Sequence, residues 1–258
     1  MKSFHALNPA VPSENAGALC ALAVMTKAPQ AGQVKTRLVP PLTPDEAAEL
    51  NKSFLRDTAA AISHIYNRRL VGSAAAATTN ACGVAVYTPS GAESAYVDIL
   101  PADFVLLPQR GENFGDRLYF AAVDLFKCGF GSVCLIDSDS PTVPPENFAQ
   151  AVRLLERPGE RIVLGPSDDG GYYLIGLKKP HRKMFERIDW STERVLDQTM
   201  RRAAESGLEV ELLPTGYDVD DAAALRRLCD ELLGQNTCRS VAPNTRKFLA
   251  SIAAQNKL

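Results

Sequence analysis

Hydrophobic residues along the chain alternate between short continuous runs and segments with helical spacing. The continuous runs predict strands buried on both faces, and apolar residues three and four positions apart predict helices. Predicted strands lie at 18–25, 84–88, 104–107, 132–136, 161–165, 172–177 and 208–213. Predicted helices lie at 91–100, 115–127, 145–156, 191–206, 222–233 and 245–254, and a further one begins at residue 44. This alternation predicts an α/β fold, with helices on the faces of a sheet.

The start of the first helix carries the clearest local signal. Thr43-Pro44-Asp45-Glu46 has the pattern of a capping box, with Pro at the first helical position. Behind it, residues with helical spacing continue to position 65, so this helix follows the first strand after a loop at 26–42.

The ends and the uncharged stretches of the chain indicate one domain. The first 18 residues contain Asn, Pro, Ser and Glu and lack the apolar core of a signal peptide, so we interpret 1–18 as a flexible extension. No linker divides the remainder, which predicts a single domain at 19–258. The longest uncharged stretch, 70–92, holds too many Ser, Thr, Asn, Gly and Pro residues for a membrane span.

Charge and cysteine content narrow the class of protein. Lys and Arg number 28 against 30 Asp and Glu, which gives a formal net charge of −2. Nucleic-acid binders usually carry a positive excess, so we expect no nucleic-acid partner. The six cysteines form no CxxC pair and the chain has only three His residues. This pattern favours reduced thiols in a cytoplasmic protein over disulfides or a zinc site.

The loop after the first strand is basic. In open α/β sheets ligands bind outside the carboxyl ends of the strands, so the loops that follow each strand are candidate sites. This loop contains Lys27, Lys35, Thr36 and Arg37, whose donors suit the two phosphates of a nucleotide. It is not a P-loop, because GxxxxGK[ST] is absent. The alternative is a solvated basic loop.

A second loop, 109–117, combines glycines with charged residues. Gly115 could let the backbone approach a base or ribose, and Asp116 could contact the nucleotide. Alternatively, Asp116 simply favours the start of the following helix through the helix dipole.

A third loop carries two acids directly after a buried strand. Asp137 and Asp139, in the run DSDSP, repel each other unless a cation offsets their charge. Their hard oxygen ligands favour Mg²⁺ or Mn²⁺, which also bridges substrate phosphates. The alternative is a turn in which Asp and Ser bond the local backbone before Pro141.

A fourth loop joins two apolar strands through acids and glycines. Asp168 and Asp169 could accept hydrogen bonds from sugar hydroxyls, and Gly170 and Gly171 would let a ligand approach the backbone. Asp-Gly is also typical of hairpin turns, so this reading stays open.

A further acidic cluster, DVDD at 218–221, follows the last predicted strand. One of its residues could supply a second metal ligand, and one could cap the next helix. Asp221 is the better candidate for the cap.

Taken together, these motifs resemble a bacterial family, the GT-A-type glycosyltransferases or nucleotide-diphospho-sugar transferases. The resemblance runs from about residue 20 to residue 249 and rests on KAPxxGxVKTRLxPPLTPDEAAEL, GxxFGDRL, DSDSP, LGPSDDGGYYLIGL, Trp190-Ser191-Thr192 and YDVDD. GPSDDGGYYLIGL is its most specific stretch. Through the first loop, the chain is also distantly similar to the guanylyltransferases that activate phospholactate.

The resemblance implies a single Rossmann-like GT-A domain with a mixed, mostly parallel sheet and helices on both faces. It implies a nucleotide diphosphate held with Mg²⁺ or Mn²⁺, with Lys35 and Arg37 at the phosphates. Asp139 takes the place of the metal or ribose carboxylate, and Asp220 completes the metal site. Asp169 and Gly170 fall where the sugar or acceptor is expected. Asp137 stands where the family is expected to carry Gly, so it remains a second candidate ligand.

Two enzymatic functions follow as hypotheses. The first is a metal-dependent glycosyltransferase that moves a sugar from a nucleotide-diphosphate donor to a small-molecule acceptor, with Asp169, or its neighbour Asp168, as catalytic carboxylate. The alternative is a nucleotidyltransferase acting on a phosphorylated metabolite. Sugar pyrophosphorylases carry GxGTRxxPxxxPK in the first loop, but here Lys35 replaces the Gly and no Lys follows Pro40-Pro41. A binding module without catalysis would be expected to lack these acids.

Overall fold

Seven strands form one sheet in the computed structural model, which describes residues 4–12, 16–67, 79–234 and 240–254. Their order across the sheet is β3-β2-β1-β4-β6-β5-β7. The strands are β1 (Cys20–Lys27), β2 (Ala81–Thr88), β3 (Val105–Pro108), β4 (Ser132–Ile136), β5 (Arg161–Pro166), β6 (Tyr172–Leu177) and β7 (Glu209–Leu212). Only β6 runs antiparallel to its neighbours within this part of the chain. The predicted mixed, mostly parallel sheet is confirmed.

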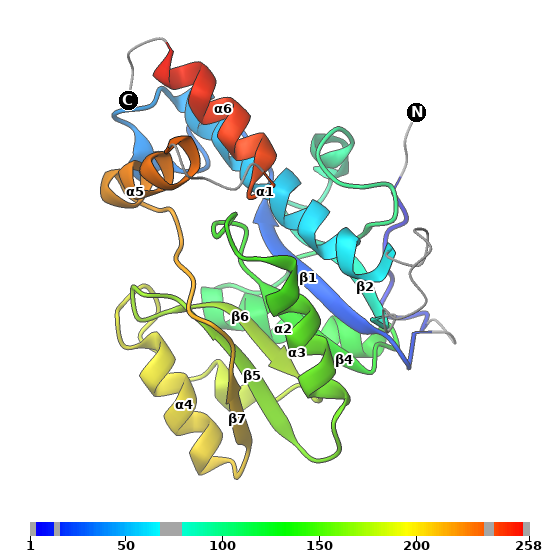
Figure 1. Cartoon of the computed structure of the whole chain (residues 1–258). Helices are drawn as coiled ribbons and strands as arrows, with labels where there is room; N and C mark the ends of the chain where they lie inside the picture. Colours follow the sequence, from blue (N-terminus) through cyan, green and yellow to red (C-terminus); the bar gives the residue numbers. More distant parts are fainter. Residues whose placement is uncertain (1–3, 13–15, 68–78, 235–239, 255–258) are drawn as a thin grey trace, which may run out of the picture.

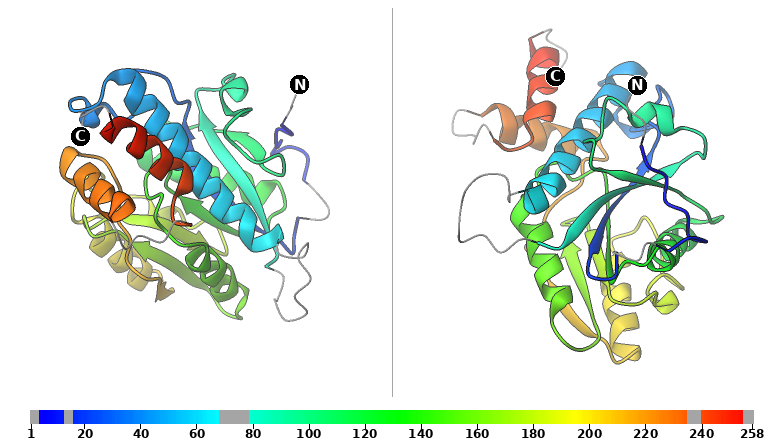
Figure 2. Two further views of the ribbon diagram at one scale, coloured as in Figure 1. Left: turned by 45° about the horizontal axis from the view of Figure 1, so that its top comes forward. Right: turned by 90° about the vertical axis from the view of Figure 1, so that its right-hand side faces the viewer.

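Helices cover both faces of the sheet, as the sequence predicts (Figures 1 and 2). They are α1 (Pro44–Asn67), α2 (Phe114–Lys127), α3 (Pro145–Glu156), α4 (Val195–Glu205), α5 (Ala222–Leu233) and α6 (Pro243–Ala253). One hydrophobic core lies between the sheet and helices α1 and α3. A second core lies between the other face and helices α2 and α4.

The first strand shows why a continuous apolar run fits this architecture. Side chains alternate along a strand, so Leu22 and Val24 face the α1–α3 core while Ala21 and Ala23 face the α2–α4 core. All four are fully buried. Both faces of β1 are therefore apolar from Ala21 to Val24, and the strand becomes polar only at its carboxyl end, with Thr26 and the exposed Lys27.

One predicted helix, 91–100, is wrong, and another, 191–206, begins later than predicted. Residues 91–100 form only a single 3₁₀ turn, η3 (Glu93–Tyr96), followed by turns in which the N–H groups of Ile99 and Leu100 both bond the carbonyl of Tyr96. The helix was predicted because buried residues lie three and four positions apart in this segment, as they do in a helix. Helix α4 begins at Val195 rather than at Ser191, because Ser191 has a left-handed backbone (φ 64°) that a helix excludes.

Part of the predicted N-terminal extension pairs with the sheet. The N–H of Leu7 bonds the carbonyl of Leu106 at 2.8 Å, and the N–H of Leu106 bonds the carbonyl of His5 at 3.0 Å. Residues 5–7 therefore cover the edge strand β3, while 1–3 and 13–15 lie outside the described residues. Among the described residues, no helix combines the length and hydropathy that crossing a membrane requires.

The last two helices form a third hydrophobic core with the start of α1. Leu225, Leu228 and Leu249 from α5 and α6 pack there against Leu50 and Phe54 of α1. The segment between β7 and α5 crosses from the sheet to these helices (Figure 1). This segment carries the DVDD cluster directly before α5. The third core, which holds α5 in place, therefore also positions these acids relative to the sheet.

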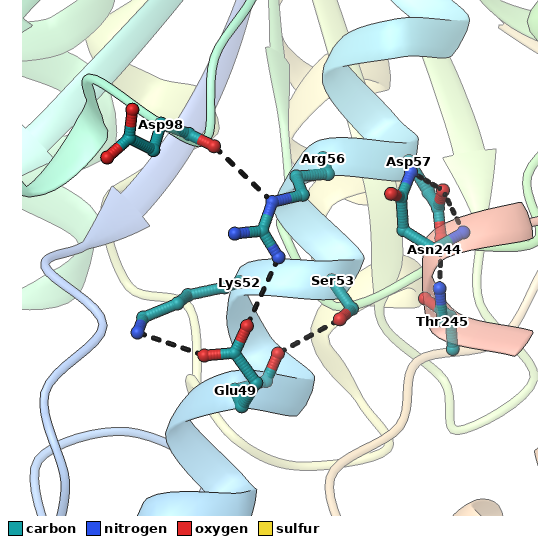
Figure 3. Close-up of polar contacts among 8 residues, drawn as sticks. All are labelled: Glu49, Lys52, Ser53, Arg56, Asp57, Asp98, Asn244 and Thr245. Carbon is teal, nitrogen blue, oxygen red and sulfur yellow. Dashed lines mark hydrogen bonds and ion pairs between the residues drawn. The ribbon is translucent and has the colours of Figure 1, made fainter. Parts of the chain in front are cut away.

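Helix α6 is capped by a residue of another helix. Ala242 at its N-cap position offers no side-chain acceptor. Instead, Asp57 of α1 accepts hydrogen bonds from the backbone N–H groups of Asn244 (3.0 Å) and Thr245 (2.8 Å) and from Asn244 Nδ2 (2.7 Å) (Figure 3). Asp57 is only 4% exposed, so this contact joins α1 to α6 in the interior.

Replacing Asp57 by alanine should lower the free energy of unfolding by about 1–2 kcal/mol, the usual effect of losing an N-cap acceptor. Two orphaned N–H groups at the start of α6 would then lie in a buried site. Urea unfolding measures the difference. Asp98→Ala is the matched control, because Asp98 is exposed and Arg56 contacts only its backbone carbonyl (Figure 3). Equal stability of the two variants would contradict this role of Asp57.

Candidate functional site

A cleft of about 840 Å³ opens at the carboxyl ends of β1 and β4. It lies at the point where the strand order changes direction, since β1 lies between β2 and β4 in the sheet. Its walls come from the ends of β1, β4 and β6 and from the loops that follow β4, β5 and β7. Eight acids (Asp137, Asp139, Asp168, Asp169, Glu193, Asp218, Asp220 and Asp221) and two arginines (Arg37 and Arg227) line it. The cleft is therefore strongly acidic.

Lys35 joins three loops beside this cleft. Its Nζ lies 2.9 Å from Asp139 Oδ1 and 2.8 Å from Asp220 Oδ1, and it donates to the carbonyl of Val219 at 2.7 Å. The N–H of Val219 in turn bonds the carbonyl of Asp139 at 3.0 Å. The loops after β1, β4 and β7 thus meet at one ammonium group. It brings together Asp139 and Asp220, the two acids proposed from the sequence as metal ligands, whereas Lys35 was expected to contact a phosphate.

Backbone conformation and burial direct Lys35 inward. The residue has a left-handed backbone (φ 49°, ψ 36°), and the next turn, η1 (Thr36–Leu38), is anchored by the fully buried Leu38. The Lys35 side chain is only 4% exposed. Burial opposes its charge, but attraction to Asp139 and Asp220 outweighs this effect and raises the pKa of Lys35. All three ammonium hydrogens have acceptors, so Lys35 organises the acids rather than meeting a phosphate directly.

The structure separates the two acids of the DSDSP loop. Asp137 accepts a hydrogen bond from the hydroxyl of Ser140 at 2.7 Å. Burial, followed by repulsion from Asp139, raises the pKa of Asp137 well above its usual 3.8. Asp139 is 31% exposed and paired with Lys35. Asp139 is therefore the better placed of the two for an ionised ligand.

The loop between β5 and β6 divides its two acids in a similar way. Asp168 forms a short ion pair with Arg227 of α5, whose guanidinium lies over the ring of Tyr217 at 3.8 Å from its centroid. Asp168 is thus a link between this loop and α5. Asp169 accepts a hydrogen bond from the N–H of Gly171 at 2.9 Å and lines the cleft, which leaves it as the candidate base.

The other residues that were predicted to bind phosphate differ in whether they line the cleft. Arg37 is exposed and lines the cleft. Thr36 starts the η1 turn and is exposed, and Lys27 is exposed and hydrogen-bonded to Gln33 at 3.3 Å, but neither lines this cleft. Of the four, Arg37 is the residue that can reach a ligand here.

Two residues predicted to contact the nucleotide have structural roles in α2. Asp116 belongs to the cap of the helix, where its N–H bonds the side chain of Asn113 at 2.9 Å. Gly115 is buried, and a Cβ there would lie 2.6 Å from the carbonyl oxygen of Phe185 and 2.8 Å from Trp190 Nε1. Gly115 therefore permits the close approach of Trp190 to the helix rather than that of a nucleotide.

Gly170 likewise allows two loops to touch. It has φ +88°, and a Cβ there would lie 2.2 Å from the carbonyl oxygen of Glu193. The N–H of Leu196 bonds the carbonyl of Gly170 at 2.8 Å. Gly170 was predicted to let a sugar approach the backbone. The direction in which a Cβ would project is instead occupied by the 190–196 segment. Gly171, its neighbour, does line the cleft.

The donor set suits a divalent cation that arrives with a nucleotide. No group of three or more His, Cys, Asp or Glu side chains among the described residues is arranged to hold a metal alone. Mg²⁺ needs only one or two protein carboxylates when phosphates and water supply its other ligands. Lys35 bonds Oδ1 of Asp139 and of Asp220, which leaves Oδ2 of each for a cation. The residues present therefore fit a metal ion whose ligands come partly from the nucleotide phosphates better than one held by protein side chains alone.

Replacing Lys35 by methionine should lower the free energy of unfolding by about 2–3 kcal/mol, because two acids and a carbonyl lose a charged donor. For a chain of this size that corresponds to a melting temperature roughly 4–10 °C lower. Mn²⁺ should raise the melting temperature of this variant more than that of the wild type, since the freed carboxylates can then bind it. Lys27→Met, an exposed lysine on the same loop, is the control. Equal melting temperatures would contradict the role of Lys35.

Replacing Gly115 by alanine should destabilise the protein by about 1–3 kcal/mol, as overpacking of a tight contact does. The added methyl group would push Trp190 away from α2 and shift its fluorescence emission, which thermal unfolding followed by fluorescence records. Gly17→Ala is the control, because a Cβ there meets only one atom, at 3.9 Å. An unshifted emission spectrum would show that Trp190 does not depend on Gly115.

Several residues that line the cleft were given no functional role from the sequence, among them Asp218, Glu193 and Phe114. Asp218 was grouped with its neighbours but not singled out, and burial followed by repulsion from Asp169 raises its pKa to about 6. Glu193 and Phe114 also line the cleft. Asp218 had a sequence signal in the DVDD run, and Phe114 is part of the GxxFGDRL motif, but neither motif indicated a role for the residue. Glu193 had no such signal, since only the fold brings its loop to the cleft.

Comparison with known proteins supports the same fold. A family described as "Uncharacterized protein conserved in bacteria (DUF2064)" matches residues 71–192. None of the curated proteins compared matches the chain. Two solved structures are similar to the chain only at TM-scores below 0.5. They are a cytidylyltransferase from Leptospira borgpetersenii (TM-score 0.48, 8% identity, 92% of this chain and 94% of that chain) and glucosyl-3-phosphoglycerate synthase from Mycobacterium tuberculosis (TM-score 0.47, 11% identity, 93% and 80%).

A third crystal structure is much more similar. It comes from Desulfovibrio desulfuricans G20 and is provisionally described as a nucleotide-diphospho-sugar transferase. It shares 27% sequence identity with this chain, covers 91% of this chain and 95% of its own, and has a TM-score of 0.76. The resemblance to the GT-A-type nucleotide-diphospho-sugar transferases that the motifs indicate is thereby confirmed, over nearly the whole length of the chain.

Proposed function

We propose that this protein is a metal-dependent transferase that moves a sugar from a nucleotide-diphosphate donor to a small-molecule acceptor. One observation carries the proposal: Lys35 holds Asp139 and Asp220 together at the carboxyl ends of the strands, in a cleft with eight acids. A nucleotide diphosphate brings further negative charge to this cleft. Such a ligand requires a cation, and Mg²⁺ or Mn²⁺ suits the carboxylate oxygens available.

Different residues of the cleft would take different roles in this reaction. Arg37 would donate to a phosphate oxygen of the donor as the diphosphate departs. When bound to Asp139 and Asp220, the divalent cation would neutralise part of the charge that develops on the diphosphate. If the reaction inverts the sugar, a carboxylate must take the proton of the acceptor hydroxyl, and Asp169 is the candidate because Asp168 is paired with Arg227.

A second candidate, nucleotidyl transfer, has one observation in its favour. The backbone of Lys35 is left-handed (φ 49°), a conformation that favours Gly. Sugar pyrophosphorylases carry Gly at this place in the first-loop pattern. The loop could therefore keep the same path around a nucleoside triphosphate, although its Lys35 side chain is committed to Asp139 and Asp220.

A thermal-shift panel tests both functions. Nucleoside diphosphates, triphosphates and nucleotide sugars are added with and without Mn²⁺, because a ligand selective for the folded state raises the melting temperature by mass action. A Mn²⁺-dependent shift with a nucleotide-diphosphate sugar supports sugar transfer. A larger shift with a triphosphate supports nucleotidyl transfer. No shift with any nucleotide would contradict both.

A further inference from the structure

Part of the cleft wall is aromatic. Phe114, Tyr172 and Trp190 form what we term the aromatic corner. The ring of Trp190 lies 5.0 Å from that of Phe114 and 6.5 Å from that of Tyr172, both in edge-to-face arrangements. Phe114 is 52% exposed although it is large and apolar. All three residues line the cleft.

Two glycines fix the position of this corner. Gly115 lets the indole of Trp190 lie against the start of α2, and Gly170 lets the 190–196 segment touch the β5–β6 loop. Thr192 Oγ1 also donates to the carbonyl of Asp189 at 2.7 Å, which closes the turn around Trp190. The aromatic corner is thus held by backbone contacts on both sides, as a preformed binding surface would be.

The polar side chains beside the aromatic corner include a hydroxyl and two carboxylates. They can form hydrogen bonds with a ligand, but none of them is positively charged. Ser167 lines the cleft and is only 6% exposed. Within the part of the chain that the structure describes, Ser167 Oγ has no hydrogen-bond partner. Asp169 and Glu193 add two carboxylates. A buried hydroxyl without a partner, in a cleft that also exposes the ring of Phe114, indicates a polar ligand with an apolar face.

The charges nearby limit what that ligand can carry. Of the two cleft-lining arginines, Arg227 is paired with Asp168 and lies over Tyr217, and Arg37 follows β1 on the basic loop. Arg194, next to Glu193, is paired with Asp189 at 3.2 Å and does not line the cleft. A phosphate or carboxylate at the aromatic corner would therefore face Asp169 and Glu193 with no unpaired cleft-lining cation from its own side of the cleft to offset them. Like charges placed opposite each other are strongly unfavourable.

We propose that the aromatic corner, with Ser167 and Glu193, is a subsite for a sugar ring that carries no negative charge. The C–H face of such a ring packs against Phe114 and Trp190, and its hydroxyls bond Ser167 and the carboxylates. The ring belongs to the acceptor or to the donor sugar of the proposed reaction, on which this inference rests. The subsite itself binds free sugars without nucleotide.

Trp190 is the only tryptophan of the chain, so its fluorescence emission reports on this subsite. The full-length protein is titrated with glucose, glucosamine and glucose 6-phosphate, which share one ring and differ in charge. Glucose and glucosamine should change the emission saturably. Glucose 6-phosphate should bind at least about tenfold more weakly, because its phosphate meets Asp169 and Glu193.

Variants separate stacking from charge. Phe114→Ala should weaken glucose binding at least about fivefold, whereas Leu212→Ala, which shortens a similarly exposed side chain on β7, should not change it. Glu193→Lys should raise the affinity for glucose 6-phosphate relative to glucose. The proposal is overturned if glucose 6-phosphate binds as tightly as glucose, if none of the three sugars changes the emission, or if Phe114→Ala behaves like Leu212→Ala.

A further titration shows whether the bound sugar ring belongs to the acceptor or to the donor sugar. Glucose is titrated in the presence of UDP-glucose and Mn²⁺, and in the presence of UDP and Mn²⁺. Glucose binding that persists with both ligands assigns the subsite to the acceptor, and binding blocked only by UDP-glucose assigns it to the donor sugar. A failed nucleotide panel with intact glucose binding would remove the proposed function and keep the subsite, so the two failures are distinguishable.

Discussion

Replacing Asp139 by alanine should abolish the effect of a divalent cation on the binding of a nucleoside diphosphate. Asp139 lies just past the buried strand β4, keeps 31% of its side chain exposed, and offers Oδ2 to a cation while Oδ1 bonds Lys35. Changes outside the first coordination sphere of a metal already reduce affinity about 10–100-fold. Loss of a direct ligand should therefore weaken Mn²⁺-dependent nucleotide binding by at least about 100-fold.

Calorimetric titration measures this effect, using the nucleoside diphosphate that gives the largest thermal shift, with Mn²⁺ present or chelated. Asp137→Ala is the matched control from the same loop. Its raised pKa and its bond to Ser140 make Asp137 a poor ligand, so most of the Mn²⁺ effect should remain. Metal-independent binding in the wild type would refute the metal site. If Asp137→Ala alone abolishes the effect, the metal site stands and Asp139 is the wrong acid.

Replacing Asp169 by asparagine should slow turnover by a factor of about 10² or more, the scale expected for a lost general base. Asn keeps the size of the side chain and can still accept the hydrogen bond from the N–H of Gly171. Nucleotide and metal binding should therefore be retained. The measurement is kcat with the nucleotide sugar and acceptor that the ligand panel identifies, with calorimetry as the check on binding.

Asp168→Asn is the matched control for this experiment. Asp168 is paired with Arg227, so its substitution should loosen the contact with α5 and lower stability, with a smaller effect on kcat than that of Asp169→Asn. Full activity of Asp169→Asn would remove Asp169 from the mechanism. A large loss of kcat in Asp168→Asn, with stability unchanged, would transfer the catalytic role to Asp168.

Much of the fold follows from local patterns. The apolar run of β1 and the capping box before α1 each depend on neighbouring residues only, and the bonds between Thr43 and Glu46 form as predicted. The 91–100 segment shows where such patterns mislead. Tyr96, Ile99 and Leu100 are buried at helical spacing, yet their burial comes from turns packed against the sheet.

The candidate site was predictable to the extent that it depends on strand ends. Acids after a buried strand lie at the carboxyl edge of a parallel sheet, which is why Asp139 was expected to face a ligand. Asp220 was expected to join it only through the resemblance to the GT-A-type glycosyltransferases. Asp221 was expected to cap α5, and it does accept from Ala223 and Ala224. The roles of Lys35 and Gly115 were not predictable, because each depends on atoms of segments far away along the chain.

The sequence by itself determined which elements form and which strand ends carry charge, because spacing, capping and burial of apolar runs act over a few residues. Only the tertiary structure decided which cation meets which acid. Lys35 reaches Asp220 across 185 positions of the chain, and Phe114 contacts Trp190 although 76 positions separate them in the sequence. Such contacts depend on how helices and loops are placed by the packed cores. No local pattern encodes that placement, so the acidic cleft and its aromatic corner became visible only in three dimensions.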